Sequence, residues 1–388
     1  MGAPGAVMTA ALMGIENSAL DGSPGEDHPP SRARRFTVSV RCPLNIRQSV
    51  NQHSRPQHTL NDILAQLEEW PRARFVREPT PLLEAPNLAA ILGRAPADVL
   101  LKMDAESGFG LGGNKARKLE FELSPPRLED VTCVITCGGP QSNHSRLTAA
   151  AAARLGLRCV IVVNGEPATP HTGNAYLHRL FGAEIRTVQG REERDPTMEE
   201  VAAEIDAEGG KAIVIPLGAS TPLGSLGYVR AAAEISRQWS DRAHDGTTWI
   251  FVSASSCGTY AGLALGFTLL EASDVRLVGV SPDVDESEIM EETARLIRGA
   301  ADLLGTEIST PPNLMIPTEE YVGQGYGLPS PEADEATTLL ARTEGVVLDP
   351  VYTAKTAAAM LDWCRNGRVP HGDRVVLWHT GGYPTAVI

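Results

Sequence analysis

The 388-residue sequence is poor in several features that mark particular classes of protein. Its six cysteines are scattered and form no C-x-x-C pair and no cluster with histidine, so we expect no metal site. Basic residues are fewer than acidic ones, and the net charge of −14 argues against a nucleic-acid partner or a general attraction to anionic membranes. No apolar run reaches the roughly 18 residues that a membrane-spanning helix needs.

The few cysteines also bear on the compartment. Cys133 and Cys137 fall in an apolar, strand-like run, which favours buried free thiols over a disulfide. Scattered free thiols in a large chain fit a reducing compartment, and we expect a cytoplasmic protein. Hydrophobic residues make up 42% of the chain and charged residues 21%, which is typical of a globular protein.

Residues 1–57 have few large apolar side chains. They hold six prolines, six arginines and four acidic residues, so this part is weakly positive while the remaining chain is strongly negative. We predict that it is a disordered extension. The remaining chain is long enough for two domains.

Beyond residue 99, short β-rich apolar runs alternate with helical patterns. This alternation predicts βαβ units and parallel sheets, in which ligands bind beyond the carboxyl ends of the strands. We predict strands at 99–103, 131–136, 159–163, 184–188, 211–215, 248–252, 275–280 and 374–378. We predict helices at 60–67, 145–155, 172–181, 198–207, 287–304, 331–344 and 355–364, one ending near 239 and one beginning at 259. Three polar loops that follow predicted strands mark the expected site: 137–144, 253–259 and 379–382.

Residues 112–120 read Gly-Gly-Asn-Lys-Ala-Arg-Lys-Leu-Glu. The glycines and asparagine allow a tight turn and a close approach of backbone to a ligand. Lys115 follows at the start of a helical pattern, where the positive end of the helix dipole disfavours its charged form. A lysine that loses its proton easily can attack a carbonyl carbon, and Lys118 lies one turn later on the same face. The alternative is a turn followed by a helix with solvated lysines.

The loop 253–259 combines small and hydroxyl residues at the start of a predicted helix. Its backbone N–H groups and hydroxyls can bind a phosphate, although it has neither the Gly-Lys-Ser/Thr ending of a P-loop nor the G-x-G-x-x-G pattern. An ordinary strand-to-helix turn is the alternative.

Ser142 and Asn143 also precede a predicted helix, where they can bind a carboxylate and a flat ring or its phenolic oxygen. Both are equally favoured as helix caps. We interpret His144 as a local hydrogen-bonding residue, because no G-x-S-x-G motif accompanies it. Tyr326 and Tyr352 lie in turn-rich loops, where binding and packing are both plausible roles.

Together these segments resemble the family of pyridoxal-phosphate enzymes with the tryptophan-synthase-β-like fold that includes D-cysteine desulfhydrase and 1-aminocyclopropane-1-carboxylate deaminase. The resemblance covers about residues 70–388, and its motifs occur in family order: 79–82 (PTPL), 112–120, 138–146 (GGPQSNHSR), 223–229 (LGSLGYV), 258–262 (GTYAG), 325–329 (GYGLP), 349–355 (DPVYTAK) and 379–382 (HTGG).

The resemblance implies an α/β protein of two domains, each an open and mostly parallel sheet flanked by helices, with pyridoxal 5'-phosphate in the cleft between them. The large cofactor-binding domain would comprise residues 58–123 and 230–388, and the small α/β domain residues 124–229. The resemblance alone implies a homodimer.

The same resemblance implies roles for individual residues. Lys115 resembles the Schiff-base lysine that also handles the Cα proton, and the other implied catalytic residues are Ser142, Tyr326 and Tyr352. The implied cofactor contacts are Lys115, Lys118, Asn143, Ser255, Ser256, Cys257, Gly258, Thr259 and Thr380. The implied substrate contacts are Phe109, Gln141, Ser142, Asn143 and Thr353.

Within the family, deaminases place Glu directly after the second tyrosine and Leu where this chain has Thr380. Thr353 and Thr380 therefore match the desulfhydrase-like pattern. A neutral hydroxyl at the ring nitrogen leaves the ring a weaker electron sink, which suffices when a good leaving group such as a thiol departs from Cβ. We expect α,β-elimination from D-cysteine or a similar three-carbon amino acid.

Two positions depart from the family pattern. Cys257 stands where a glycine is common in the phosphate loop, and Phe109 is an aromatic residue where a smaller one is expected and would reshape the substrate pocket. L-cysteate, 3-chloro-D-alanine and a dedicated biosynthetic amino acid are therefore alternative substrates. The alternative functions are a 1-aminocyclopropane-1-carboxylate deaminase and a ligand-binding relative without activity.

Overall fold

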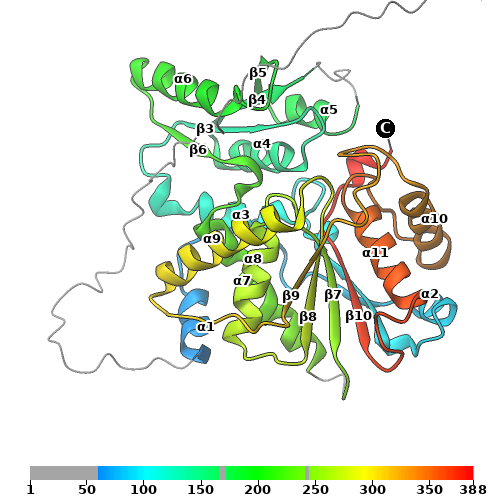
Figure 1. Ribbon diagram of the computed structural model, residues 1–388. Helices are drawn as coiled ribbons and strands as arrows, with labels where there is room; N and C mark the ends of the chain where they lie inside the picture. The colour runs from blue at the N-terminus through cyan, green and yellow to red at the C-terminus, as the bar shows by residue number, and fades with distance from the viewer. Residues whose placement is uncertain (1–59, 166–171, 241–243, 388) are drawn as a thin grey trace, which may run out of the picture. The chain divides into compact units, whose positions relative to one another are not determined.

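The computed structural model describes residues 60–165, 172–240 and 244–387 (Figure 1). The predicted extension at residues 1–57 lies outside the described residues. Within the described chain, the strands form two sheets that are flanked by helices. The predicted α/β class is confirmed.

The larger sheet has six strands in the order β1-β2-β10-β7-β8-β9. All neighbouring pairs are parallel except β1 with β2. The strands are β1 (Leu82–Glu84), β2 (Val99–Met103), β7 (Thr248–Ser253), β8 (Val275–Val280), β9 (Met315–Thr318) and β10 (Arg374–His379).

The smaller sheet has four parallel strands in the order β5-β4-β3-β6. The strands are β3 (Cys133–Gly138), β4 (Arg158–Asn164), β5 (Glu184–Val188) and β6 (Ala212–Ile215). Its helices are α4 (Asn143–Leu155), α5 (Gly173–Leu180) and α6 (Arg194–Ala207).

Side chains that alternate along each strand explain why both faces of the smaller sheet are covered. Val134 of β3 packs into the apolar cluster that contains Leu147 of α4, whereas Ile135 packs into the cluster that contains Val201 of α6. Successive strand residues point to opposite faces, so a run that is apolar throughout needs a helix on each side. Figure 1 shows α4 and α6 on opposite faces of this sheet.

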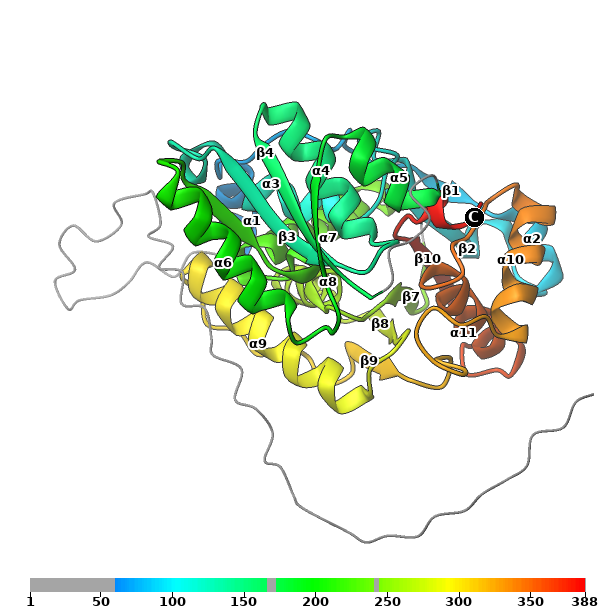
Figure 2. The ribbon, with the colours of Figure 1, turned by 90° about the horizontal axis from the view of Figure 1, so that it is seen from above.

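The larger sheet follows the same rule. Ile250 of β7 packs with one helix group and the adjacent Phe251 packs with the other. Figures 1 and 2 show the two groups on opposite faces. The first group is α1 (Leu60–Glu68), α7 (Pro222–Trp239), α8 (Gly258–Leu269) and α9 (Glu286–Leu304), and the second is α2 (Pro86–Ile91), α10 (Pro331–Glu344) and α11 (Thr353–Arg365). No helix in the described part of the chain is long and apolar enough to cross a membrane.

The remaining helix is α3 (Lys115–Glu122), which packs against α4 on one side and α7 on the other. The predicted boundary between residues 229 and 230 falls inside the continuous helix α7. The division of the chain into two domains stays a prediction.

Most predicted elements are present, with ends that shift by a few residues. The strand predicted at 131–136 is Cys133–Gly138, and the helix predicted from 145 begins at Asn143. The predicted loop 137–144 is therefore shorter than expected. The short elements β1, α2 and β9 were not predicted.

Helix α7 approaches the backbone of α3 at Gly227. A Cβ atom built on Gly227 would lie 2.3 Å from the carbonyl oxygen of Arg117, which is closer than real contacts allow. The helix pair therefore depends on the absence of a side chain at this position.

We expect Gly227→Ala to destabilise the protein by about 1–3 kcal/mol, because the two helices must move apart. The measurement is the free energy of unfolding in urea. Gly372→Ala is the matched control, since a Cβ atom there meets nothing within 4 Å. Equal stability of the Gly227→Ala and wild-type proteins would contradict the close packing.

Candidate active site

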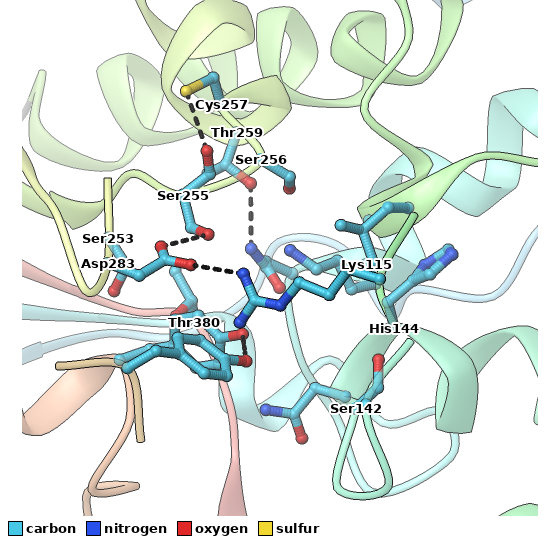
Figure 3. Close-up of a pocket in the computed structure, with 18 of the residues that line it drawn as sticks. Lys115, Ser142, His144, Ser253, Ser255, Ser256, Cys257, Thr259, Asp283 and Thr380 are labelled. Atoms are coloured by element: carbon cyan, nitrogen blue, oxygen red, sulfur yellow. Dashed lines mark hydrogen bonds and ion pairs between the residues drawn. The ribbon is translucent and has the colours of Figure 1, made fainter. Parts of the chain in front are cut away.

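A cavity of about 280 Å³ lies where strands of both sheets end. Figure 3 shows Lys115 and His144 on one side of it and Ser255, Asp283 and Thr380 on the other. The lining residues are Asn114, Lys115, Gly139, Pro140, Ser142, Asn143, His144, Asn164, Arg191, Arg194, Leu217, Gly218, Ser253, Ser255, Ser256, Cys257, Thr259, Asp283, Tyr326, Tyr352 and Thr380.

Lys115 is the first residue of α3, and its side chain lines the cavity. Burial lowers the pKa of Lys115 to about 8, from an ordinary value of 10.5. Lys118 is fully buried one turn later, where burial and the charge of Lys115 lower its pKa well below the ordinary value. Its Nζ lies 3.0 Å from the hydroxyl of Ser220, to which it donates a hydrogen bond. The arrangement provides an amine that is largely neutral above pH 8.

Two glycine pairs place Thr380 beside the start of α3. Gly112 has a φ of +74°, and a Cβ atom there would lie 1.6 Å from the carbonyl oxygen of Ala105. A Cβ atom on Gly381 would lie 2.7 Å from the Cα atom of Gly113. The two loops therefore touch through their backbones, and Asn114 N–H donates a 2.8 Å bond to the carbonyl oxygen of Thr380.

A buried network of ion pairs fixes the position of α3. Arg117 donates from Nε and Nη2 to Oδ1 of Asp104, at 3.1 and 3.0 Å, and from Nη2 to Oε1 of Glu234 at 2.8 Å. Lys102 donates to the same Glu234 oxygen at 2.5 Å. Burial alone would raise the pKa of Asp104, but Arg117 and Lys102 hold it below the ordinary value. Removing one charge would leave the others buried without compensation.

The loop before α8 is tied to Lys118 through Ser220. The hydroxyl of Ser220 donates to the hydroxyl of Ser256 at 2.8 Å and accepts from the N–H of Gly258 at 3.2 Å. These bonds fix the loop while the first-turn N–H groups of α8 give it a positive potential. Such a helix start suits a phosphate group.

Cys257 occupies a glycine-like position in this loop. Its φ is +58°, in the left-handed region, which explains why a glycine is favoured there. Its thiol lies 3.2 Å from the carbonyl oxygen of Ser255, and Figure 3 shows the sulfur turned toward that oxygen. The thiol is therefore bonded within the loop itself. Thr259 is bonded to Asn114 Nδ2 at 3.0 Å, which joins the loop to the Lys115 segment.

The loop after β3 is held by Asn174 of α5. Asn174 donates from Nδ2 to the Oδ1 atom of Asn143 at 2.9 Å, which leaves the Asn143 amino group to donate elsewhere. Ser142 is the N-cap of α4, and its hydroxyl accepts from the N–H of Ser145 at 3.1 Å. Both predicted roles of Ser142, capping and lining the site, are therefore compatible. His144 bonds to the hydroxyl of Thr136 through Nε2 at 2.7 Å.

Tyr326 and Tyr352 meet in the cavity although 26 residues separate them. Their hydroxyl oxygens lie 2.5 Å apart, and their rings cross edge to face. Burial raises the pKa of both phenols, so both are neutral at physiological pH. One phenol can therefore donate a proton while the other accepts.

Three predicted substrate contacts do not line the cavity. Phe109 stacks on Phe75 in the apolar core, with ring centroids 4.7 Å apart. The side chain of Gln141 accepts from the N–H of Asn174 at 2.8 Å and so supports the loop. Thr353 is fully buried and exchanges hydrogen bonds with Asp349 at the start of α11. Phe109 does not narrow the pocket as expected, because its ring is used in packing.

Four further polar residues line the cavity and were not predicted: Asn164, Arg191, Arg194 and Asp283. Each follows or ends a strand of a parallel sheet, so the rule that pointed to the other loops also applies to them. The two arginines add positive charge to the smaller-sheet side.

A family model described as "Pyridoxal-phosphate dependent enzyme" matches residues 74–381. The chain belongs to this family. The D-cysteine desulfhydrase of Salmonella typhimurium is 36% identical over 326 residues, which are 83% of this chain and 97% of the relative. The predicted family is confirmed, and with it a lyase-type enzyme dependent on pyridoxal phosphate.

Solved structures agree with the predicted fold. A crystal structure described as an ACC deaminase homologue matches with a TM-score of 0.74 and 35% identity, over 83% of this chain and 95% of that chain. Threonine deaminase isoform 2 of Solanum lycopersicum matches with a TM-score of 0.57 and 18% identity, over 83% of this chain and 89% of that chain, which shows a common fold.

The cavity fits the cofactor of this family. It offers an amine of lowered pKa at Lys115 and a helix start with serine hydroxyls at Ser255 and Ser256. Gly218 clears the space beside this helix start, since a Cβ atom there would lie 2.4 Å from the Ser256 hydroxyl. Thr380 offers a neutral hydroxyl. These groups match the aldehyde, phosphate and ring nitrogen of pyridoxal phosphate.

We expect covalent capture of pyridoxal phosphate by the cofactor-free protein to depend on a group with a pKa near 8. The lowered pKa makes the Lys115 amine mostly neutral above pH 8, so the rate should rise up to about that pH and then level off. The measurement is the rate of the absorbance change after pyridoxal phosphate is added. Lys115→Ala should remove the change, whereas a rate that still rises through pH 10 would refute the shifted pKa.

Proposed function

We propose that this protein removes the amino group and the β-substituent from D-cysteine or a similar three-carbon amino acid. With water, cysteine would give pyruvate, ammonia and sulfide. The placement of Lys115 against a neutral Thr380 and the paired tyrosines carries the proposal. The similarity to a D-cysteine desulfhydrase over most of both chains supports it.

Pyridoxal phosphate, when bound, supplies an electron-withdrawing ring that stabilises negative charge at the substrate Cα atom. In this proposal Ser255, Ser256 and the first-turn N–H groups of α8 would hold its phosphate, and Thr380 would serve its ring nitrogen. The Ser255 hydroxyl, which donates to Asp283 in this structure, would turn to the phosphate. Lys115 would hold the cofactor covalently, and its amine, once the amino group of the substrate has taken its place, would accept the Cα proton. Its burial suits this role, because a lysine of lowered pKa accepts and returns protons near neutral pH.

The start of α4 would bind the substrate carboxylate. Ser142 and Asn143 lie at the N-terminus of the 13-residue helix α4, and both line the cavity. The N–H groups of the first helical turn, which lack a partner within the helix, are at this end. The helix dipole favours an anion there. Gln141 acts on this loop through Asn174, as a positioning residue rather than a substrate contact.

The tyrosine pair would handle the departing group. Elimination sends the Cα proton to Lys115 and the electron pair into a Cα–Cβ double bond, while the Cβ–sulfur bond breaks and its electrons leave with sulfur. Tyr326 or Tyr352, both neutral phenols, can protonate that sulfur. Water then hydrolyses the enamine to pyruvate and ammonia.

The second candidate is a 1-aminocyclopropane-1-carboxylate deaminase that yields 2-oxobutanoate and ammonia. The likeness to the ACC deaminase homologue supports it. Opening an unactivated ring requires a stronger electron sink than a thiol elimination does. Thr353 is fully buried and bonded to Asp349, so it gives no acid or base at that position. Both points favour the elimination over the opening of the cyclopropane ring.

We expect the holoenzyme to release pyruvate and sulfide from D-cysteine and little 2-oxobutanoate from 1-aminocyclopropane-1-carboxylate. Lys115→Ala should lower kcat by a factor of about 10³ or more, because base and covalent link are lost together. Lys211→Ala, at an exposed lysine, is the control. The reverse product pattern would favour the deaminase, and a cofactor-binding protein without either product would be the inactive relative.

We also propose that the protein is a homodimer and works in the cytoplasm. The family resemblance supports the first statement and the scattered cysteines the second. The five described cysteines are all free and buried.

A further inference from the structure

Arg194 is a buried cation on the wall of the cavity. It is the first residue of α6, and 8% of its surface is exposed. Its Nε donates to Oδ1 of Asn164 at 2.9 Å, and its Nη2 donates to the same atom. Across residues 60–165, 172–240 and 244–387, Arg194 forms no ion pair within 4 Å; the charge of the neighbouring Asp195 acts on it from farther away, and burial still lowers the pKa of Arg194. A buried guanidinium whose bonded partner is a neutral amide oxygen is costly, which points to an anion supplied from outside the chain.

Arg191 adds a second cation three residues earlier. Its guanidinium carbon lies 5.3 Å from the centre of the Tyr326 ring, and its Nη1 lies 3.9 Å from Oδ2 of Asp283. Asp283 also accepts a 3.0 Å bond from the hydroxyl of Ser255. The ion pair of Asp283 is with Arg191, so within the described residues Arg194 keeps no carboxylate at ion-pair distance on the cavity wall.

The arginine wall lies next to the tyrosine pair. Arg191 covers the Tyr326 ring, and Tyr326 shares its hydroxyl bond with Tyr352. The proposed carboxylate position at Ser142 and Asn143 is already served by the start of α4. With the substrate carboxylate at α4, its β-substituent points toward the tyrosines. Arg191 and Arg194 are therefore placed to contact the β-substituent.

We propose that Arg191 and Arg194 bind a negatively charged β-substituent, so that the site prefers three-carbon amino acids carrying a sulfonate or a phosphate ester over those with a neutral substituent. This inference rests on the proposed elimination and specifies its substrate class. The same charges would stabilise any β-substituent that departs as an anion. A sulfonate would leave as sulfite and a phosphate ester as phosphate, each keeping the electron pair of the broken bond.

The first test measures binding to the holoenzyme by calorimetry with two probes that lack an amino group and cannot react. 3-Sulfopropanoate carries the second negative charge, and butanoate does not. We expect the wild-type protein to bind 3-sulfopropanoate at least tenfold more tightly. Arg194→Gln and Arg191→Gln should each remove most of this preference while the Kd of butanoate changes less than about twofold.

Matched variants separate the effect of losing the positive charge from the effect of a disturbed fold. Arg194→Lys should keep part of the preference, and Arg186→Gln should keep all of it, because Arg186 pairs with Glu204 on the exposed surface. Arg191 is mostly exposed, so Arg191→Gln gives a folded variant even if Arg194→Gln is unstable. Equal binding of the two probes by the wild-type protein would overturn the proposal. So would an equal loss of both probes in the glutamine variants, since that would place the α-carboxylate at the arginines.

The second test measures pyruvate from cysteate and from 3-chloroalanine, each as both enantiomers. We expect Arg194→Gln to lower kcat/KM for cysteate at least tenfold more than for 3-chloroalanine. Equal losses would overturn the assignment of the arginines. If the wild-type holoenzyme forms no pyruvate from any of these compounds or from cysteine, the proposed elimination fails, whereas the binding comparison still decides the charge preference.

Discussion

The buried ion pair between Arg117 and Asp104 is the interaction on which the site depends. Asp104 follows β2 and has no exposed surface, and it also accepts bonds from the Tyr228 hydroxyl at 2.5 Å and the Trp378 indole at 2.8 Å. One carboxylate thus joins strands β2 and β10 to helices α3 and α7. Lys115 lies two residues before Arg117, so the same network that fixes α3 fixes the amine at the mouth of the cavity.

Backbone contact provides the second constraint on Lys115. The Gly112–Gly113 pair lies against Ala105 and Gly381 so closely that side chains are excluded. The ion network fixes the body of α3, and the two glycine loops fix its first residue, Lys115. Lys115 consequently reaches the cavity from a rigidly held backbone. Burial of its amine lowers the pKa to about 8.

The fold and the centre of the site could be predicted because each rests on local patterns. Apolar runs identified most strands, and polar loops after them marked the cavity. The short strand β9 was missed because it has four residues and contains Pro317. Phe109 was expected in the pocket from its place beside the lysine segment, but stacking on Phe75 is a long-range contact that spacing does not show. Arg191 was missed because a charged loop is usually solvated.

The central claim is that Lys115, and not its buried neighbour Lys118, binds the cofactor covalently. Reduction of the holoenzyme with borohydride followed by peptide mass mapping tests it most directly. The chain has four other lysines, Lys102, Lys118, Lys211 and Lys355, which serve as internal controls. The account predicts a pyridoxyl phosphate adduct on Lys115 alone. An adduct on Lys118, or no adduct in a protein that binds the cofactor, would contradict it.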